Sequence, residues 1–135
     1  MSKIATTCII DDDPIFVFGA QKIMEMTDFS EKFIVFGNGQ EAIEGLKPML
    51  SSDQPFPEVI LLDLNMPIMD GWEFLDEFIT IPREKAITIY IVTSSIDPED
   101  IKRVKEYDVV NKYILKPVTV DALKEILEDL KRAAS

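Results

Sequence analysis

Acidic residues stand at two places in the sequence where a short apolar run ends. Asp11–Asp13 follow the run Thr6–Ile10, and Asp63 directly follows the run Val59–Leu62. If both runs are parallel strands, their carboxyl ends lie at one edge of a sheet and at least three carboxylates meet there. Like charges at such short range raise one another's pKa unless a cation compensates them. Oxygen ligands without histidine or cysteine favour Mg²⁺ as that cation.

A simple capping role accounts for one of these acids but not for another. Asp13 precedes Pro14, and this pair is typical of a helix N-cap followed by proline at the first helical position. We therefore assign Asp13 to capping. Capping does not explain Asp63, which directly follows four consecutive apolar residues.

Two further strand ends bring a hydroxyl and a cation to the same edge. The run Ile87–Val92 continues into Thr93, and the run Tyr113–Leu115 continues into Lys116. A carboxylate nucleophile, Mg²⁺, a hydroxyl and a lysine suit phosphoryl transfer, which needs positioning and charge neutralisation more than a proton-transfer base. Taken singly, Thr93 could be a turn residue and Lys116 a solvated charge. Their place beside Asp63 favours a shared site.

The elements that must position these residues alternate along the chain. Short runs rich in Ile and Val are typical of strands buried on both faces of a parallel sheet. The runs are Thr6–Ile10, Phe33–Phe36, Val59–Leu62, Ile87–Val92 and Tyr113–Leu115. Capping signals mark five helix starts, at Asp13-Pro14, Asn38 with Glu41, Asp70 with Glu73, Asp97-Pro98 and Thr119. This order predicts an α/β fold, a doubly wound five-stranded parallel sheet with helices on both faces.

The composition describes one globular domain and excludes several functions. The chain of 135 residues is 47% hydrophobic and 29% charged, which predicts a single domain over residues 1–135 with no output domain. The net charge of -11 argues against direct binding of nucleic acid. The absence of histidine excludes histidine triads and histidine metal sites. No run approaches the roughly 18 apolar residues of a membrane span and no signal peptide is visible, so we expect a cytoplasmic protein without membrane contact.

The chain resembles the receiver domains of two-component response regulators. The resemblance extends from Lys3 to about Ala133. Its motifs are the acidic pair after the first strand, Asp63-Leu64-Asn65-Met66-Pro67 with Met69-Asp70-Gly71, Thr93-Ser94 and Lys116-Pro117. It implies a flavodoxin-like (βα)5 fold with strand order 2-1-3-4-5. It also implies a stand-alone signalling switch of the chemotaxis-receiver type. Such a switch is not an enzyme and catalyses only its own phosphorylation and dephosphorylation.

The resemblance further implies a phosphoryl acceptor and a set of Mg²⁺ ligands. By this resemblance Asp63 is the phosphoacceptor, and a histidine kinase or a histidine phosphotransfer protein supplies the phosphoryl group. Asp12 binds Mg²⁺ directly and Asp11 acts largely through a water. Asp63 and the main-chain carbonyl of Asn65 complete the ligands. The identities of the kinase and of the downstream protein target are left open.

The resemblance assigns the remaining site residues to stabilisation and switching. Thr93 hydrogen-bonds one phosphoryl oxygen and Lys116 pairs with another, with the lysine aimed inward by a cis bond to Pro117. Tyr113 matches the switch aromatic, which packs inward when Thr93 moves. The output face is then formed by the fourth helix, the fifth strand and the fifth helix, around Ile101, Val104 and Val120. The side chains of Asn65 and Ser95 would tune the rate of dephosphorylation.

An apolar run opens the first predicted helix beside the acids. Ile15, Phe16, Val17 and Phe18 are consecutive, and a helix on one face of a sheet buries only part of its circumference. We expect Ile15 or Phe18 to stay exposed and to dock the phosphodonor protein. The alternative is that helix packing hides all four.

Three other functions compete with a phosphorylated receiver. A haloacid-dehalogenase-like phosphatase would need a second acid two residues after its nucleophile, where this chain has Asn65, and a cap domain that 135 residues cannot hold. A flavodoxin-like cofactor binder would need a Gly/Ser/Thr-rich phosphate loop after the first strand, where this chain has acids. A degenerate receiver would serve only as a scaffold.

Overall fold

A computed structural model describes residues 4–52, 54–82, 86–94 and 97–134. Within this part of the chain the strands form one parallel sheet in the order β2-β1-β3-β4-β5, which confirms the predicted fold class and strand order. The strands are β1 (Ile4–Ile10), β2 (Ser30–Phe36), β3 (Val59–Leu62), β4 (Thr88–Thr93) and β5 (Val110–Leu115).

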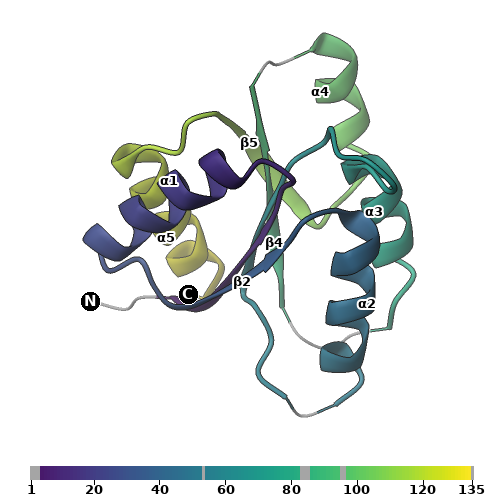
Figure 1. Ribbon diagram of the computed structural model, residues 1–135, viewed down its shortest axis with the longest axis horizontal. Coiled ribbons are helices and arrows are strands. Elements are labelled where there is room, and N and C mark those ends of the chain that lie inside the picture. Colours follow the sequence, from purple (N-terminus) through teal and green to yellow (C-terminus); the bar gives the residue numbers. More distant parts are fainter. Residues whose placement is uncertain (1–3, 53, 83–85, 95–96, 135) are drawn as a thin grey trace.

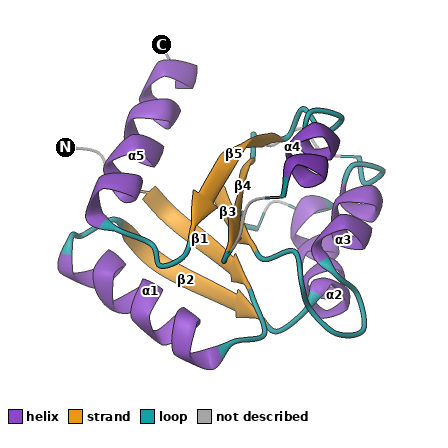
Figure 2. Ribbon diagram, turned by 90° about the horizontal axis from the view of Figure 1, so that it is seen from above, coloured by secondary structure: helices purple, strands orange, loops and turns teal. Residues whose placement is uncertain are grey.

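Helices cover both faces of this sheet (Figures 1 and 2). They are α1 (Pro14–Met26), α2 (Gly39–Leu50), α3 (Gly71–Phe78), α4 (Pro98–Val104) and α5 (Val120–Ala134). In Figure 2, α1 and α5 lie on one side of the sheet, and α2, α3 and α4 lie on the other. In the described ranges, no helix combines the length and apolarity that a membrane crossing requires.

Most of the predicted helix starts have the expected caps. The carboxylates of Asp13 and Asp97 accept hydrogen bonds from the backbone two residues on, and Asp70 and Glu73 form a reciprocal capping box. Thr119 Oγ1 accepts from the backbone N–H of the third residue after it, 3.1 Å away. These side chains satisfy N–H groups that the helix itself leaves unpaired.

The capping box predicted at Asn38 is only half formed. Asn38 accepts from the backbone N–H of Glu41 at 2.9 Å. The Glu41 carboxylate, however, accepts from the backbone N–H of Gly37 at 3.2 Å rather than from that of Asn38. The acid still satisfies a backbone donor, one residue earlier than the box requires.

The two edge strands are longer than the apolar runs predicted. Strand β2 begins at Ser30 rather than Phe33, and β5 begins at Val110 rather than Tyr113. The added residues include exposed polar side chains such as Glu31 and Asn111. An edge strand contacts only one neighbour and faces water more often, so continuous apolarity underestimates its length.

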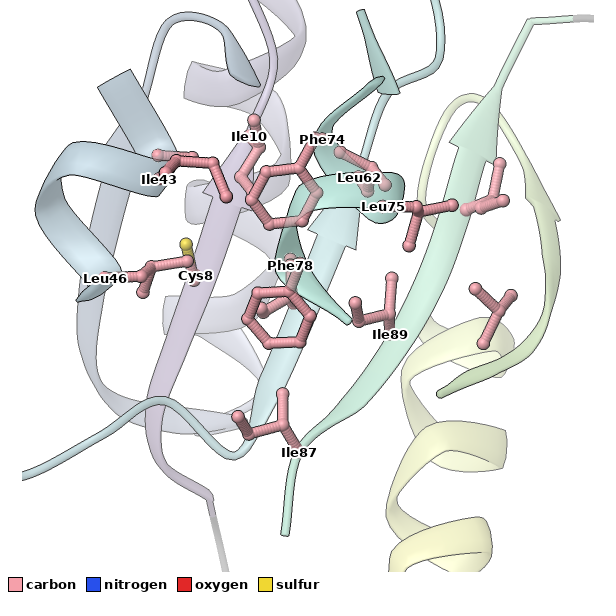
Figure 3. Close-up of a cluster of buried hydrophobic side chains, with 14 of the residues drawn as sticks. Cys8, Ile10, Ile43, Leu46, Leu62, Phe74, Leu75, Phe78, Ile87 and Ile89 are labelled. Atoms are coloured by element: carbon pink, nitrogen blue, oxygen red, sulfur yellow. The ribbon is translucent and has the colours of Figure 1, made fainter. Parts of the chain in front are cut away.

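Two hydrophobic clusters, one on each face, hold the layers together. Figure 3 shows the cluster beneath α2 and α3, where Phe74 and Phe78 stack with ring centroids 5.3 Å apart. Cys8 is fully buried in it and burial raises the pKa of its thiol, as expected of a core cysteine. The second cluster lies beneath α1 and α5 and includes Ile9, Met24 and other apolar side chains. Together the clusters hold the sheet in place, and the site lies at the carboxyl ends of its strands.

Candidate functional site

The predicted meeting of three carboxylates is present at the carboxyl ends of β1 and β3. Ile10 pairs with Leu62 across these strands, and the backbone N–H of Asp63 donates to the carbonyl of Ile10 at 2.9 Å. The side chains that follow therefore emerge side by side. Carboxylate oxygens of Asp11, Asp12 and Asp63 all lie within 4.8 Å of one another.

The two acids after β1 differ in their surroundings. Asp11 is buried, with a side chain 2% exposed and 2.9 Å from the ammonium of Lys116. Its other oxygen accepts a hydrogen bond from the backbone N–H of Asp13 at 2.9 Å. Asp12 is exposed to solvent. Protein groups thus already engage both oxygens of Asp11, whereas Asp12 faces outward.

The surroundings of Asp63 raise the pKa of its carboxyl group. Burial and the neighbouring charge of Asp11 raise its pKa to about 6, although the Lys116 ammonium and the backbone N–H of Asn65 lower it. Lys116 Nζ lies 3.7 Å from Asp63 Oδ1. One lysine thus serves two buried acids, with the Asp12 carboxylate nearby. Excess negative charge built from hard oxygen donors suits a small divalent cation such as Mg²⁺.

Lys116 is held at this edge by contacts on several sides. Burial lowers its pKa, but the hydrogen bond and charge of Asp11, with the charge of Asp63, raise it overall, so the ammonium stays protonated. Its backbone N–H donates to the carbonyl of Thr93 at 2.8 Å, which ties the ends of β4 and β5 together. Thr93 is buried. The predicted cis bond between Lys116 and Pro117 is present.

The loop after Asp63 is closed by backbone contacts. The N–H of Gly71 donates to the carbonyl of Leu64 at 2.9 Å, and the N–H of Gly39 donates to the carbonyl of Met69 at 3.0 Å. A Cβ atom on Gly71 would lie 2.6 Å from the carbonyl oxygen of Asp63. Only glycine permits this approach, so α3 begins directly against the site.

Tyr113 lies on β5, where it pairs with Ile91 of β4. It is half-buried against the cluster beneath α2 and α3. Its hydroxyl is buried, and within the described ranges nothing forms a hydrogen bond with it. Burial, with smaller contributions from the charges of Asp100 and Asp97, raises the pKa of Tyr113 to about 12.

The surface around Tyr113 differs from the predicted one at one residue. Ile101 and Val120 are exposed as expected, and Leu115 is also exposed. The expectation that Val104 contributes to this surface is wrong, because Val104 is 8% exposed and belongs to the cluster beneath α2 and α3. Val104 ends a helix of 7 residues, and its side chain anchors that helix to the core.

The apolar run at the start of α1 is partly exposed. Ile15 is 82% and Phe18 62% exposed, whereas Phe16 and Val17 are half-buried. The expectation that Ile15 or Phe18 stays exposed is thus confirmed for both residues, and the alternative that helix packing hides all four is wrong. A shallow groove of about 330 Å³ passes from Asp11 and Asp12 along α1 to Val35 on β2.

Two groups of contacts near the site were not predicted from the sequence. The ring of Phe16 lies 4.4 Å from the Lys116 ammonium. At α3, the Trp72 ring contacts Arg103 and Tyr107, whose hydroxyl donates to Asp76. Aromatic and charged residues at helical spacing gave a weak signal for this cluster. The expectation for Ser95 concerns a residue outside the described ranges.

Comparisons with known proteins identify the family of the chain. The family model of the response regulator receiver domain matches residues 7–128. The nitrate/nitrite response regulator protein NarL of Escherichia coli is 32% identical over 133 residues, which cover 97% of this chain and 55% of NarL. The probable methanogenesis regulatory protein FilR2 of Methanothrix harundinacea is 26% identical over 123 residues, or 91% of this chain and 79% of FilR2. The chain therefore spans about half the length of NarL and most of FilR2.

Solved structures show the same fold. The crystal structure of a two-component response regulator from Cytophaga hutchinsonii matches with a TM-score of 0.88 at 30% identity, covering 97% of this chain and 99% of that one. The N-terminal domain of a response regulator receiver protein from Methanoculleus marisnigri matches with a TM-score of 0.69 at 30% identity, covering 96% and 97%. With the family match over residues 7–128, these findings establish that the chain belongs to the response regulator receiver domains of two-component signalling.

Proposed function

We propose that this receiver accepts a phosphoryl group on Asp63 from a histidine kinase or a histidine phosphotransfer protein, in a Mg²⁺-dependent reaction. The observation that carries the proposal is the position of Asp63, a buried carboxylate at the end of a central strand, with Asp11, Asp12 and Lys116 around it. Receiver domains are signalling switches, and we propose that this one catalyses only its own phosphorylation and dephosphorylation.

In the proposed transfer, one bond to phosphorus forms and one bond to phosphorus breaks. A carboxylate oxygen of Asp63 forms the new bond to phosphorus while the bond from phosphorus to the donor breaks. The leaving group is imidazole, which takes its proton from solvent, or acetate when acetyl phosphate is the donor. Because no side chain of the receiver has to transfer a proton, the absence of histidine is compatible with this chemistry.

The residues present suit Mg²⁺ at the acidic cluster. Asp12 is exposed and would bind the ion directly, and Asp63 would supply a second carboxylate. Lys116 and the N–H of Asp13 already engage Asp11, which supports a role through water. The main-chain carbonyl of Asn65 would complete the protein ligands. When bound, Mg²⁺ would neutralise charge on the phosphoryl oxygens.

Two further residues would stabilise the transferred group. Thr93 ends β4 at the site and would donate its hydroxyl to one phosphoryl oxygen. Lys116 would move from its carboxylate partners to pair with another oxygen. Its ammonium lies 3.7 Å from Asp63 at present, which supports a short movement. Charge-assisted hydrogen bonds of this kind are among the stronger ones in proteins.

Output is proposed to pass through the surface of α4, β5 and α5 to a downstream protein. Thr93 and Tyr113 would act as the switch, and the buried hydroxyl of Tyr113, which has no hydrogen-bond partner among the described residues, is consistent with an alternative position for the ring. The charge of -11 supports a protein target rather than nucleic acid. We extend the proposal to one receiver domain over residues 1–135 that acts in the cytoplasm. The intact mass and location of the endogenous protein would test this.

The decisive experiment is incubation with Mg²⁺ and acetyl phosphate followed by intact-mass measurement. We expect one phosphoryl adduct on the wild type and none on Asp63→Asn. Asp97→Asn is a matched control, because Asp97 caps α4 away from the acidic cluster and asparagine caps equally well. A wild type that acquires no adduct at any Mg²⁺ concentration would instead support the scaffold alternative. An adduct on Asp63→Asn would move the acceptor elsewhere.

A further inference from the structure

The ring of Phe16 lies against the cation of the site. Its centroid is 4.4 Å from Nζ of Lys116, well within the range of about 6 Å over which an aromatic face attracts an ammonium. Asp11 and Asp63 approach the same ammonium at 2.9 and 3.7 Å. The Lys116 side chain is 18% exposed. Phe16 therefore adds an uncharged partner to a cation otherwise bound by carboxylates.

The helix fixes the position of Phe16 independently of Lys116. Asp13 caps α1, and Phe16, Ala20 and Met24 follow at four-residue spacing on the side that packs into the cluster beneath α1 and α5. Residues at this spacing share one face of a helix. The flanking Ile15 is 82% exposed. Packing on the sheet thus holds the ring in place, whereas the lysine reaches it through a flexible side chain.

We propose that Phe16 is a positioning residue for Lys116, an inference that rests on the proposed phosphorylation of Asp63. A lysine side chain has four rotatable methylenes and a strongly hydrated head group. The Phe16 ring would hold the ammonium at the inner rim and keep water from one side of it. The cation then stays within a short movement of the position that a phosphoryl oxygen on Asp63 requires, which lowers the ordering cost in the transition state.

The uncharged ring suits this task better than another acid would. A carboxylate at the position of Phe16 would compete with the phosphoryl oxygens for the ammonium. An aromatic face attracts the cation through its quadrupole and has no net charge. Lys116 can therefore shift its ion pair from Asp11 toward the phosphoryl group while it keeps its contact with the ring.

The kinetic test compares Phe16→Leu, which keeps an apolar side chain without a π face, with Phe16→Tyr, which keeps the face. We expect phosphorylation by acetyl phosphate to slow by about 3- to 10-fold in Phe16→Leu and to stay within about 2-fold of wild type in Phe16→Tyr. Phe33→Leu is the matched control, because Phe33 packs against the same hydrophobic cluster from β2. If Phe16→Leu does not fold, Phe16→Met replaces it.

Two readouts separate positioning from a structural role. In a Lys116→Ala background, Phe16→Leu should cause no further slowing, because the two residues act through one contact. In NMR spectra, the Lys116 ε-methylene protons should show an upfield ring-current shift that disappears in Phe16→Leu and returns in Phe16→Tyr. Equal slowing with and without Lys116, equal slowing in Phe33→Leu, or wild-type rates in Phe16→Leu would overturn the inference. A wild type that is never phosphorylated would overturn the proposed function instead, and the ring-current shift would still test the contact.

Discussion

Lys116 forms its shortest ion pair with Asp11, at 2.9 Å. The pair occupies a buried carboxylate of the acidic cluster and leaves Asp12 exposed. Asp11 and Asp12 therefore have different roles in the cluster. One acid holds the lysine, and the other is free to face an incoming cation.

From this division we expect Mg²⁺ binding to depend mainly on Asp12 and Asp63. Asp12→Ala and Asp63→Asn should each weaken Mg²⁺ binding by about tenfold or more, because each removes a charged ligand from a site with few. Calorimetry would measure the affinity. Trp72 fluorescence is a second readout, since Trp72 follows Gly71, whose N–H closes the loop after Asp63. Asp13→Asn is the capping control, and unchanged affinity in Asp12→Ala would contradict the assignment.

The raised pKa of Asp63 predicts a pH-dependent cost to stability. Burial and Asp11 raise its pKa from 3.8 to about 6 in the folded protein. At a pH below the pKa of Asp63 in the unfolded chain, the carboxyl is protonated in both states and stability is unaffected. The loss of stability grows as the pH rises between the unfolded and folded pKa values, and it is complete above the folded pKa. Without Mg²⁺, Asp63→Asn should therefore be more stable than wild type by about 3 kcal/mol at pH 7.5.

Denaturant titrations at several pH values would measure that difference. The gain in the free energy of unfolding should shrink as pH falls below 6 and disappear near pH 3.8, the two pKa values of Asp63. Asp97→Asn again serves as a control for removing an acid. A gain that is the same at all pH values would show that the substitution acts by another route.

The exposed start of α1 is expected to dock the phosphodonor protein. Phe18→Ser should stay folded, because Phe18 is 62% exposed, and should slow transfer from the cognate kinase by about tenfold. Phosphorylation by acetyl phosphate should be unchanged, because a small donor needs no docking surface. Met26→Ser is the matched control, since Met26 is 84% exposed at the far end of the same helix. Wild-type transfer to Phe18→Ser would place docking elsewhere.

The proposed switch predicts that Thr93 and Tyr113 move together. A phosphoryl group on Asp63 adds charge and acceptor oxygens, and Thr93 should shift toward them and vacate space for the Tyr113 ring. The coupling should be about 1–3 kcal/mol, so the unphosphorylated protein already samples the active form. Structures with and without beryllofluoride, which mimics the acyl phosphate, would show the movement. If Thr93 does not move and Tyr113 keeps the same rotamer in both structures, the switch is refuted. The assignment of Asp63 as the phosphoacceptor would not be affected.

Two glycines give opposite predictions for the same substitution. Gly71→Ala should destabilise the protein by about 1–3 kcal/mol, because the new Cβ would lie 2.6 Å from the Asp63 carbonyl oxygen. Gly19→Ala on α1 should stabilise it by about 0.5–1 kcal/mol, because within the part of the chain that the structure describes no atom beyond its chain neighbours and the nearby backbone of α1 lies within 4 Å of that Cβ. Thermal unfolding of both variants would check the signs. A stable Gly71→Ala would mean that the loop after Asp63 yields easily.

The sequence predicted best what strand geometry alone determines. Val59–Leu62 is apolar throughout because both faces of β3 are covered, so its bounds were predicted correctly. The convergence of Asp11 and Asp63 followed from parallel strands with a common edge. Edge strands were underestimated because their exposed polar residues, such as Glu31, break the apolar pattern.

Contacts between side chains on separate elements could not be predicted in the same way. The approach of Phe16 to Lys116 depends on how α1 packs beside the end of β5. The hydrogen bond from Tyr107 to Asp76 depends on how the segment after α4 lies against α3. Val104 was placed on the surface because a short helix gives too few residues to define its buried face.

Strand β1 assigns neighbouring residues to different halves of the molecule. Cys8 and Ile10 belong to the hydrophobic cluster beneath α2 and α3, whereas Ile9 between them belongs to the cluster beneath α1 and α5. Because the sheet separates the clusters, substitutions in one have few shared neighbours with substitutions in the other, and their energies should add. Substitutions can therefore accumulate in one hydrophobic cluster without changing the energetic effect of substitutions in the other. Epistasis should be concentrated within each layer and at the strand ends where the acids and Lys116 meet.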